Sequence, residues 1–354
     1  MNELSRRDLL ARGAVLAAAS GLSAPHVWAQ GDFMKPARIT VGSTSYISSG
    51  PHMIALAKGY FTKLNLDVGT KLYVDGALSL PSLAAGEIDM AGATMSAGLF
   101  NLMIKSPGIR IVMERGRESP GMGSNAILVS NALWDKGFRN LDGYKFAKGE
   151  KIAVSTRGAV AEYLHVVALK RAGLTPDDVD WQWGMQTRAS LPLMKQNQIG
   201  VMNLPLPAVA AAVKQGIGKI ATWSDEIAPE FVLACSVVGP RMLKEEGYSA
   251  IVRYFMGIMK ANEEYMEAAQ SGNPEILKIL AQGTGLPVET INETRPRWTR
   301  MGDGIPNISS IVAQQAYWHE KTDLLVKTVP DGQMFDLRAV REARQRMSEK
   351  NPFI

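Results

Sequence analysis

Residues 38–61 read R-I-T-V-G-S-T-S-Y-I-S-S-G-P-H-M-I-A-L-A-K-G-Y-F, and residues 77–93 read A-L-S-L-P-S-L-A-A-G-E-I-D-M-A-G-A. The run Arg38–Val41 is short, rich in β-branched residues and bounded by Gly42, which predicts a buried strand. Ser48 or Ser49 can cap the helix that follows it. A strand and then a helix are therefore expected within the first part of this stretch.

The same alternation continues further along the chain. Leu66–Val74 predicts a second strand, Leu78–Ala85 a second helix, and Glu87–Ala91 leads into a third strand. Strands that alternate with helices favour a mostly parallel sheet with helices on its faces. The fold class expected from this stretch is therefore α/β.

Three short patterns in this stretch carry a family resemblance. They are A-x-x-x-G-Y-F at 55–61, L-x-V at 66–68 and L-x-x-G-E-I-D at 83–89. In this order they resemble the extracytoplasmic solute-binding proteins of ABC importers, in the NMT1/SsuA/THI5-like group that handles nitrate, sulfonates, taurine and pyrimidine thiamin precursors. The resemblance covers about residues 36–235. It implies a two-lobed periplasmic-binding-protein fold of type II, in which each lobe is a mixed, mostly parallel sheet flanked by helices.

A second unit repeats the first. Lys151–Thr156 parallels Arg38–Ser43, and Ser190-Leu191-Pro192 parallels Ser79-Leu80-Pro81 at almost the same spacing. Two similar α/β units argue for two lobes of related build. We expect lobe 1 to comprise residues 36–123 and 236–354, with a helical C-terminal region, and lobe 2 to comprise residues 124–235. The chain would cross between the lobes at about 121–130 and 225–238.

The first 29 residues have the pattern of an export signal. Ser5-Arg6-Arg7-Asp8-Leu9-Leu10 matches a twin-arginine signal, and the apolar stretch Ala14–Gly21 is too short to span a bilayer. We expect cleavage near Gln30 and a periplasmic location. An uncleaved N-terminal membrane anchor remains the alternative.

The composition limits the function classes. The chain has 354 residues, 46% of them hydrophobic, and a formal net charge of +5. This length suits about two domains, and the mild positive charge is too small to argue for nucleic-acid binding. Cys235, the single cysteine, lies in an apolar run, so we expect a buried residue and no disulfide within the chain.

In open α/β sheets, ligands bind where the loops after the strands converge. The predicted ligand-binding residues are Ser45, Tyr46, Ser48, Ser49, Thr94, Met95, Ser124, Asn125, Thr156, Arg157, Gly158, Asn203 and Trp223. Arg157 suits a carboxylate, sulfonate or phosphate, because a guanidinium pairs with such groups through two hydrogen bonds. Arg157 could instead point to solvent or pair with Glu162. Tyr46 and Trp223 could stack on a flat ligand or simply form the walls of the site.

An enzyme is the main alternative class. The sequence has no G-x-S-x-G, H-E-x-x-H or Walker pattern, and we expect no catalytic residue, metal or cofactor. His52 follows Ser48 and Ser49, so a Ser–His pair is conceivable, but serine before a helix is usually a cap. The fungal pyrimidine synthases of the resembled group use a cysteine-rich run that is missing from this sequence.

The sequence as a whole predicts a monomeric, periplasmic solute-binding protein that delivers a small organic anion to an ABC permease in the inner membrane. A neutral pyrimidine-type heterocycle is the alternative ligand. A sensor that presents its solute to a membrane receptor is the alternative role.

Overall fold

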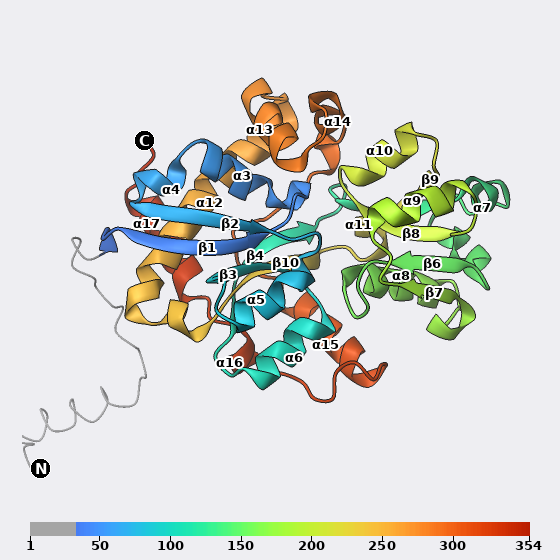
Figure 1. The fold of residues 1–354 in the computed structure, drawn as a ribbon, viewed down its shortest axis with the longest axis horizontal. Helices are drawn as coiled ribbons and strands as arrows, with labels where there is room; N and C mark the ends of the chain where they lie inside the picture. Colours follow the sequence, from blue (N-terminus) through green and yellow to red (C-terminus); the bar gives the residue numbers. More distant parts are fainter. Residues whose placement is uncertain (1–32) are drawn as a thin grey trace, which may run out of the picture. The chain divides into compact units, whose positions relative to one another are not determined.

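The computed structural model describes residues 33–354, and within these Pro36–Ile354 form one compact unit (Figure 1). The predicted signal peptide at residues 1–29 lies outside the described residues. None of the helices among the described residues is both long enough and apolar enough to cross a membrane.

The first sheet contains five strands in the order β2-β1-β3-β10-β4. Their bounds are β1 Ala37–Ser43, β2 Leu66–Leu72, β3 Met90–Thr94, β4 Arg110–Glu118 and β10 Phe231–Val238. β1 pairs in parallel with both β2 and β3, whereas β10 runs antiparallel to its neighbours β3 and β4. The sheet is therefore mixed.

The second sheet repeats this plan in the order β7-β6-β8-β5-β9. Its strands are β5 Asn125–Val129, β6 Lys151–Val154, β7 Asp180–Trp183, β8 Val201–Pro205 and β9 Lys219–Trp223. β6 pairs in parallel with β7 and β8, and β5 runs antiparallel to β8 and β9. The internal repeat predicted from the sequence is thus present as two sheets of the same topology.

In each sheet, the antiparallel strand is the first strand along the sequence after the chain crosses from the other sheet. The chain leaves β4 to enter β5, and it returns from β9 through α11 (Ser224–Ile227) to β10. The expected two-lobed type II fold is confirmed by this topology. All of β10 lies in the first sheet, so the return crossing precedes Phe231; it falls within the predicted range 225–238 but before the predicted lobe boundary after Cys235.

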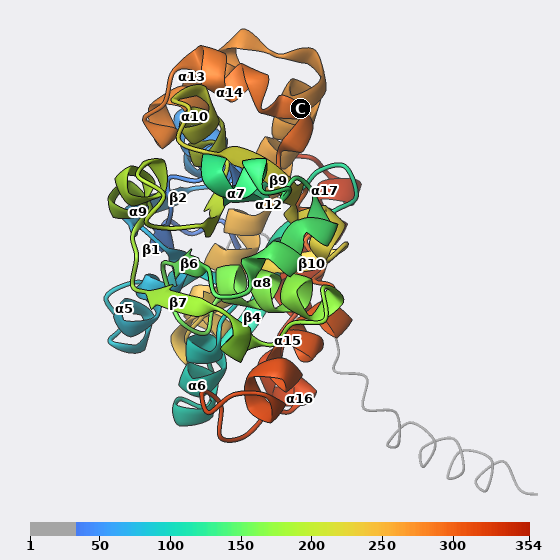
Figure 2. The same cartoon turned by 90° about the vertical axis from the view of Figure 1, so that its right-hand side faces the viewer.

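Helices cover both faces of the first sheet (Figure 1). One group contains α3 (Gly50–Ala57), α4 (Tyr60–Lys63), α12 (Glu245–Ser271) and α17 (Arg338–Glu349), with α13 (Pro274–Thr284) and α14 (Val288–Glu293) beyond α3. The other group contains α5 (Leu80–Ala84), α6 (Ala97–Lys105), α15 (Ile308–Glu320) and α16 (Asp331–Met334). The second sheet carries α7 (Asn131–Asp135), α8 (Val160–Arg171), α9 (Thr187–Lys195), α10 (Ala208–Lys214) and α11, and the first four of these are labelled in Figure 2.

The predicted helical C-terminal region is confirmed, and α12 is its longest element. Ile251, Tyr254, Phe255 and Tyr265 lie on its apolar stripe and are buried, so the stripe packs into the core. In the basic cluster at 295–300, Arg297 pairs with Asp225 at 3.1 Å.

β4 is longer in the structure than the sequence predicts. The sequence predicts a strand that begins at Arg110 and ends at Met113, because residues 116–123 are polar and rich in glycine. In the structure, β4 continues to Glu118, since β10 pairs along its whole length. This extension brings Arg115 into the site described next.

Candidate functional site

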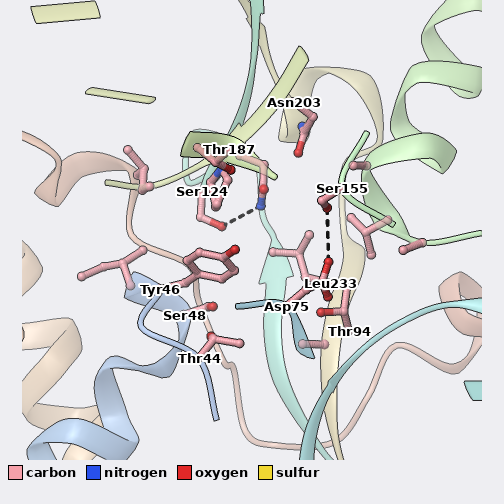
Figure 3. A pocket seen from close by; sticks show the side chains of 18 of the residues that line it. Thr44, Tyr46, Ser48, Asp75, Thr94, Ser124, Ser155, Thr187, Asn203 and Leu233 are labelled. Atoms are coloured by element: carbon pink, nitrogen blue, oxygen red, sulfur yellow. Dashed lines mark hydrogen bonds between the residues drawn. The ribbon is translucent and has the colours of Figure 1, made fainter. Parts of the chain in front are cut away.

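A cavity of ≈ 100 Å³ lies between the two sheets, at the carboxyl ends of β1, β2, β3, β6 and β8 (Figure 3). It is lined from the first sheet and its loops by Thr44, Tyr46, Ile47, Ser48, Ser49, Asp75, Gly92, Thr94, Arg115, Leu233 and Ala234. The second sheet and its loops contribute Ser124, Asn125, Ala153, Ser155, Ala159, Val160, Ala161, Met185, Thr187, Met202, Asn203, Pro205 and Leu206. A ligand here would contact both lobes.

The structure gathers part of the predicted site. The predicted residues that line the cavity are Tyr46, Ser48, Ser49, Thr94, Ser124, Asn125 and Asn203. The predicted residues that do not line it are Ser45, Met95, Thr156, Arg157, Gly158 and Trp223. The loops that follow the strands therefore do supply lining residues, but not every residue of these loops lines the cavity.

Arg157 is not among the residues that line the cavity. Its guanidinium lies 3.1 Å from the Asp323 carboxylate and 5.6 Å from the centre of the Trp183 ring, and its side chain is 54% exposed. Sequence reasoning placed Arg157 at the ligand and considered Glu162 as its other partner. The exposure of Arg157 agrees with the alternative that it points to solvent, but its partner is Asp323 and not Glu162; Asp323 lies far along the chain and could not be paired with Arg157 by sequence spacing.

Four other predicted residues outside the lining have structural contacts. The Trp223 ring lies 4.5 Å from the Arg297 guanidinium, and Met95 is buried. Thr156 donates a hydrogen bond to Asp75 at 3.0 Å. Gly158 has a φ of 76°, a backbone conformation that favours glycine, and its carbonyl accepts a hydrogen bond from Ala97 N–H at 2.8 Å.

Arg115 is the lining residue that sequence reasoning missed. The pairing of β4 with β10 passes from Glu114–Cys235 directly to Gly116–Ala234, so Arg115 is an extra residue in the ladder. Such a bulge changes the direction of a side chain. The predicted strand ended before this position, and no local pattern in the sequence marks a bulge.

The Arg115 guanidinium lies against the backbone of the first sheet. A Cβ atom added to Gly92 would come within 1.8 Å of Arg115 Nη1, so the glycine leaves the room that the guanidinium occupies. Nη2 donates to Ser43 Oγ at 3.4 Å, whereas Nη1 is buried and has no hydrogen-bond partner among the described residues. Arg115 thus offers an unused charged donor at the floor of the cavity.

Asn203 supplies a second unused donor from the opposite sheet. It lies on β8, and its Nδ2 is buried with no hydrogen-bond partner in the described part of the chain. The first turns of α8 and α9 also begin at lining residues, and neither helix has a side-chain cap. The free N–H groups of a first turn add further donors and a partial positive charge.

Hydroxyl groups and one carboxylate complete the polar lining. Ser49 stands at the N-cap of α3 as predicted, but its hydroxyl makes no cap hydrogen bond and instead contacts Thr44 Oγ1 at 3.1 Å. Tyr46 donates to the Val74 carbonyl at 2.5 Å. Burial, assisted by the nearby charge of Asp75, raises the pKa of Tyr46 to about 12, so the phenol stays neutral.

The described histidines do not form a Ser–His pair. His52 pairs with Thr70 Oγ1 at 2.9 Å and with Tyr254 Oη at 3.0 Å, and not with Ser48 or Ser49. Burial, with the Arg115 charge adding to it, lowers the pKa of His52 to about 3. The residues that line the cavity include neither histidine nor cysteine, and Cys235 is buried as expected. Among the described residues, no cluster of His, Cys, Asp and Glu has the arrangement of a metal site.

Comparison with protein families identifies the chain. The model of the NMT1-like family matches residues 33–277, which is more than half of the sequence. The chain belongs to the NMT1-like family. This confirms the resemblance drawn from the three short patterns of the first lobe. No curated protein matches the sequence significantly.

Solved structures share the fold of this NMT1-like protein. The periplasmic nitrate-binding protein NrtA from Synechocystis PCC 6803 matches with a TM-score of 0.73 and 15% identity, covering 89% of this chain and 90% of that one. The aliphatic sulphonate-binding protein SsuA from Escherichia coli matches with a TM-score of 0.68 and 18% identity, covering 85% and 92%. The alkanesulfonate-binding protein SsuA from Xanthomonas axonopodis pv. citri, bound to MOPS, gives 0.66 and 18%, covering 87% and 98%.

Proposed function

We propose that this protein captures a small organic or inorganic oxyanion between its two lobes and delivers it, as the substrate-binding component, to an ABC importer. Membership of the NMT1-like family and the shared fold of nitrate- and sulfonate-binding proteins support this proposal. We further propose export through the twin-arginine signal, a periplasmic monomer and docking to an inner-membrane permease.

One observation carries the choice of an anion. Arg115 on the first sheet and Asn203 on the second line the same cavity, and each has a buried donor, Nη1 and Nδ2, with no hydrogen-bond partner among residues 33–354. A buried donor without an acceptor costs about 1–3 kcal/mol, and more when it is charged. An oxyanion supplies several acceptor oxygens at once, so it can satisfy donors from both sheets together. A neutral heterocycle would leave the Arg115 charge without a counter-charge.

The size of the cavity agrees with a small ligand. A water needs roughly 10–15 Å³ of such space, so ≈ 100 Å³ admits several waters or a molecule with a handful of non-hydrogen atoms. Nitrate and short sulfonates or carboxylates fit within this limit. Leu233 and Met185 add apolar surface that suits a short carbon chain.

Binding rather than catalysis is the role that we propose. The cavity offers hydrogen-bond donors and hydroxyl groups, and its lining holds no histidine or cysteine that could serve as a base or thiolate nucleophile. A protein that presents its solute to a membrane sensor would use the same cavity. The import role and the sensor role therefore differ in the membrane partner and not in the binding site.

The test compares two arginine variants of equal charge. Arg115→Gln removes the guanidinium from the cavity, and Arg157→Gln removes one from the exposed pair with Asp323. Isothermal titration with nitrate, ethanesulfonate, acetate and the neutral pyrimidine cytosine gives the affinity of each protein. A hydrogen bond to a charged group contributes about 1.5–3 kcal/mol, so Arg115→Gln should weaken the bound anion about 10- to 100-fold.

Arg157→Gln should change every affinity by less than about fivefold, because an exposed ion pair contributes about 0–1 kcal/mol. A wild type that binds none of these anions would overturn the anion assignment, and equal anion binding by wild type and Arg115→Gln would remove Arg115 as its anchor. Tight binding of cytosine that is unchanged in Arg115→Gln would favour the neutral heterocycle. Turnover of any of these compounds would replace binding with catalysis.

A further inference from the structure

A single carboxylate joins the two lobes beside the cavity. Asp75 follows β2 of the first sheet and is only 9% exposed. Its Oδ2 accepts hydrogen bonds from Ser155 Oγ at 3.3 Å and from Thr156 Oγ1 at 3.0 Å, and both hydroxyls follow β6 of the second sheet. Figure 3 shows the bond from Ser155 to Asp75 spanning the seam between the lobes.

The orientation of Asp75 is fixed from its own lobe. Asp75 is the N-cap of the short 3-10 helix Gly76–Ser79, and its Oδ1 accepts the Ala77 N–H at 2.9 Å. A Cβ atom on Gly76 would lie 2.6 Å from the Gly92 carbonyl, so this turn sits tightly against β3. The carboxylate is therefore held in place and presents Oδ2 to the other lobe.

Backbone contacts lie close to this carboxylate. Ala97 N–H donates to the Gly158 carbonyl across the seam at 2.8 Å, two residues beyond Thr156. On another part of the rim, the Ile47 N–H donates to the Leu206 carbonyl at 3.4 Å. These contacts exist only while the lobes are together, so Asp75 is part of the closed seam.

The charge of Asp75 needs an explanation in a site for an anion. Asp75 and Arg115 are the charged residues among those that line the cavity. A free carboxylate next to an anion would repel it. Here, both oxygens of Asp75 accept hydrogen bonds from the protein, from Ala77 on one side and from Ser155 and Thr156 on the other.

From this arrangement we infer that Asp75, with Ser155 and Thr156, is a latch that stabilises the closed arrangement of the lobes and does not bind the ligand itself. The latch raises the fraction of protein that is closed before any ligand arrives. It therefore strengthens the binding of every ligand by the same factor. This inference rests on the proposed capture of a solute by closure of the lobes.

Thr156 gives the sharpest test, because it donates to Asp75 but does not line the cavity. Thr156→Val removes the hydroxyl and keeps the shape of the side chain, whereas Thr156→Ser retains the donor. Small-angle X-ray scattering of the ligand-free proteins measures the radius of gyration. Isothermal titration with nitrate and ethanesulfonate measures the affinities.

We expect Thr156→Val to increase the radius of gyration of the ligand-free protein and to leave that of the saturated protein unchanged. Both affinities should fall by the same factor, about 5- to 10-fold, and Thr156→Ser should restore them. Asp75→Ala should act in the same way, and the double variant Asp75→Ala/Thr156→Val should be no weaker than Asp75→Ala alone. A Thr156→Val protein with wild-type scattering and wild-type affinities would overturn the latch.

Unequal effects on the two ligands, or tighter anion binding by Asp75→Ala, would also overturn the latch, because both place Asp75 at the ligand. The scattering of the ligand-free protein does not depend on the proposed function. If neither anion binds the wild type, the proposed function fails, and the comparison of ligand-free Thr156→Val with Thr156→Ser still decides whether the latch exists.

Discussion

Glu118 joins the two segments by which the chain crosses between lobes, and its substitution gives a quantitative test. It ends β4 and is fully buried. Its carboxylate accepts four hydrogen bonds, from Ser124 N–H at 2.6 Å, Ser124 Oγ at 2.8 Å, Ser224 Oγ at 2.6 Å and Asn125 Nδ2 at 3.2 Å. Ser124 and Asn125 lie where the chain enters the second sheet, and Ser224 lies on the segment by which it returns.

Burial raises the pKa of Glu118 from 4.5 to about 7, although these hydrogen bonds oppose the rise. The folded protein therefore favours the neutral carboxyl group. A raised pKa contributes stability below the unfolded value near 4.5, and this stability is lost as the pH rises through about 7. One pKa unit corresponds to about 1.4 kcal/mol, so the loss between pH 4.5 and pH 8 amounts to about 3 kcal/mol.

The substitution Glu118→Gln removes the titrating group and keeps its shape. We expect the free energy of unfolding of Glu118→Gln, minus that of the wild type, to rise by about 3 kcal/mol between pH 4.5 and pH 8. Urea unfolding followed by circular dichroism at four pH values measures this difference. His52 and His165 are present in both proteins, so their titration cancels. A difference that stays constant over this range would refute the reasoning.

Two further predictions concern the floor of the cavity and the core of the second lobe. Gly92→Ala should weaken anion binding about as much as Arg115→Gln, since its Cβ would lie 1.8 Å from Arg115 Nη1; unchanged affinity in titration calorimetry would remove Arg115 as the anchor. Tyr144→Phe should reduce the free energy of unfolding by about 1–3 kcal/mol, because it takes the hydroxyl from buried His165 Nδ1, 2.8 Å away, and it should leave ligand affinity unchanged. Wild-type stability in urea would contradict this.

The fold was largely predictable because the signals that define it are local. Apolar runs such as Arg38–Val41 and Lys151–Val154 mark buried strands wherever they occur, and their repetition reveals the second lobe. The extent of β4 was not predictable in this way. Its last residues pair with β10, which follows only after the chain has completed the second lobe, and the pairing across space extends a strand that local composition would end at Met113.

In the candidate site, too, some residues could be predicted from local sequence and others could not. Tyr46, Ser48 and Asn203 were predicted because the fold class alone brings the loops after the strands together. Arg115 and Arg157 were not correctly assigned, because the direction of a long side chain depends on its immediate surroundings. A bulge turns Arg115 inward over Gly92, whereas the distant Asp323 pairs with Arg157 on the surface.

The contacts available in the cavity are too few to account for tight binding unless closure assists. Micromolar affinity requires about −8 kcal/mol. A charged hydrogen bond from Arg115 contributes about 1.5–3 kcal/mol and a neutral one from Asn203 about 0.5–1.5 kcal/mol, before the cost of association. These donors lie on different sheets, so an anion can engage both only in the closed form, and it shifts the protein toward that form.

A latch at Asp75 reduces the free energy that the ligand must supply to shift the protein toward the closed form. When only a fraction of the protein is closed, the apparent dissociation constant equals the intrinsic one divided by that fraction. Raising the closed fraction from about 5% to about 50% would thus tighten binding about 10-fold without any new contact to the ligand. Because this factor is the same for all ligands, selectivity is left to Arg115 and Asn203, and affinity and specificity reside in different residues of one cavity.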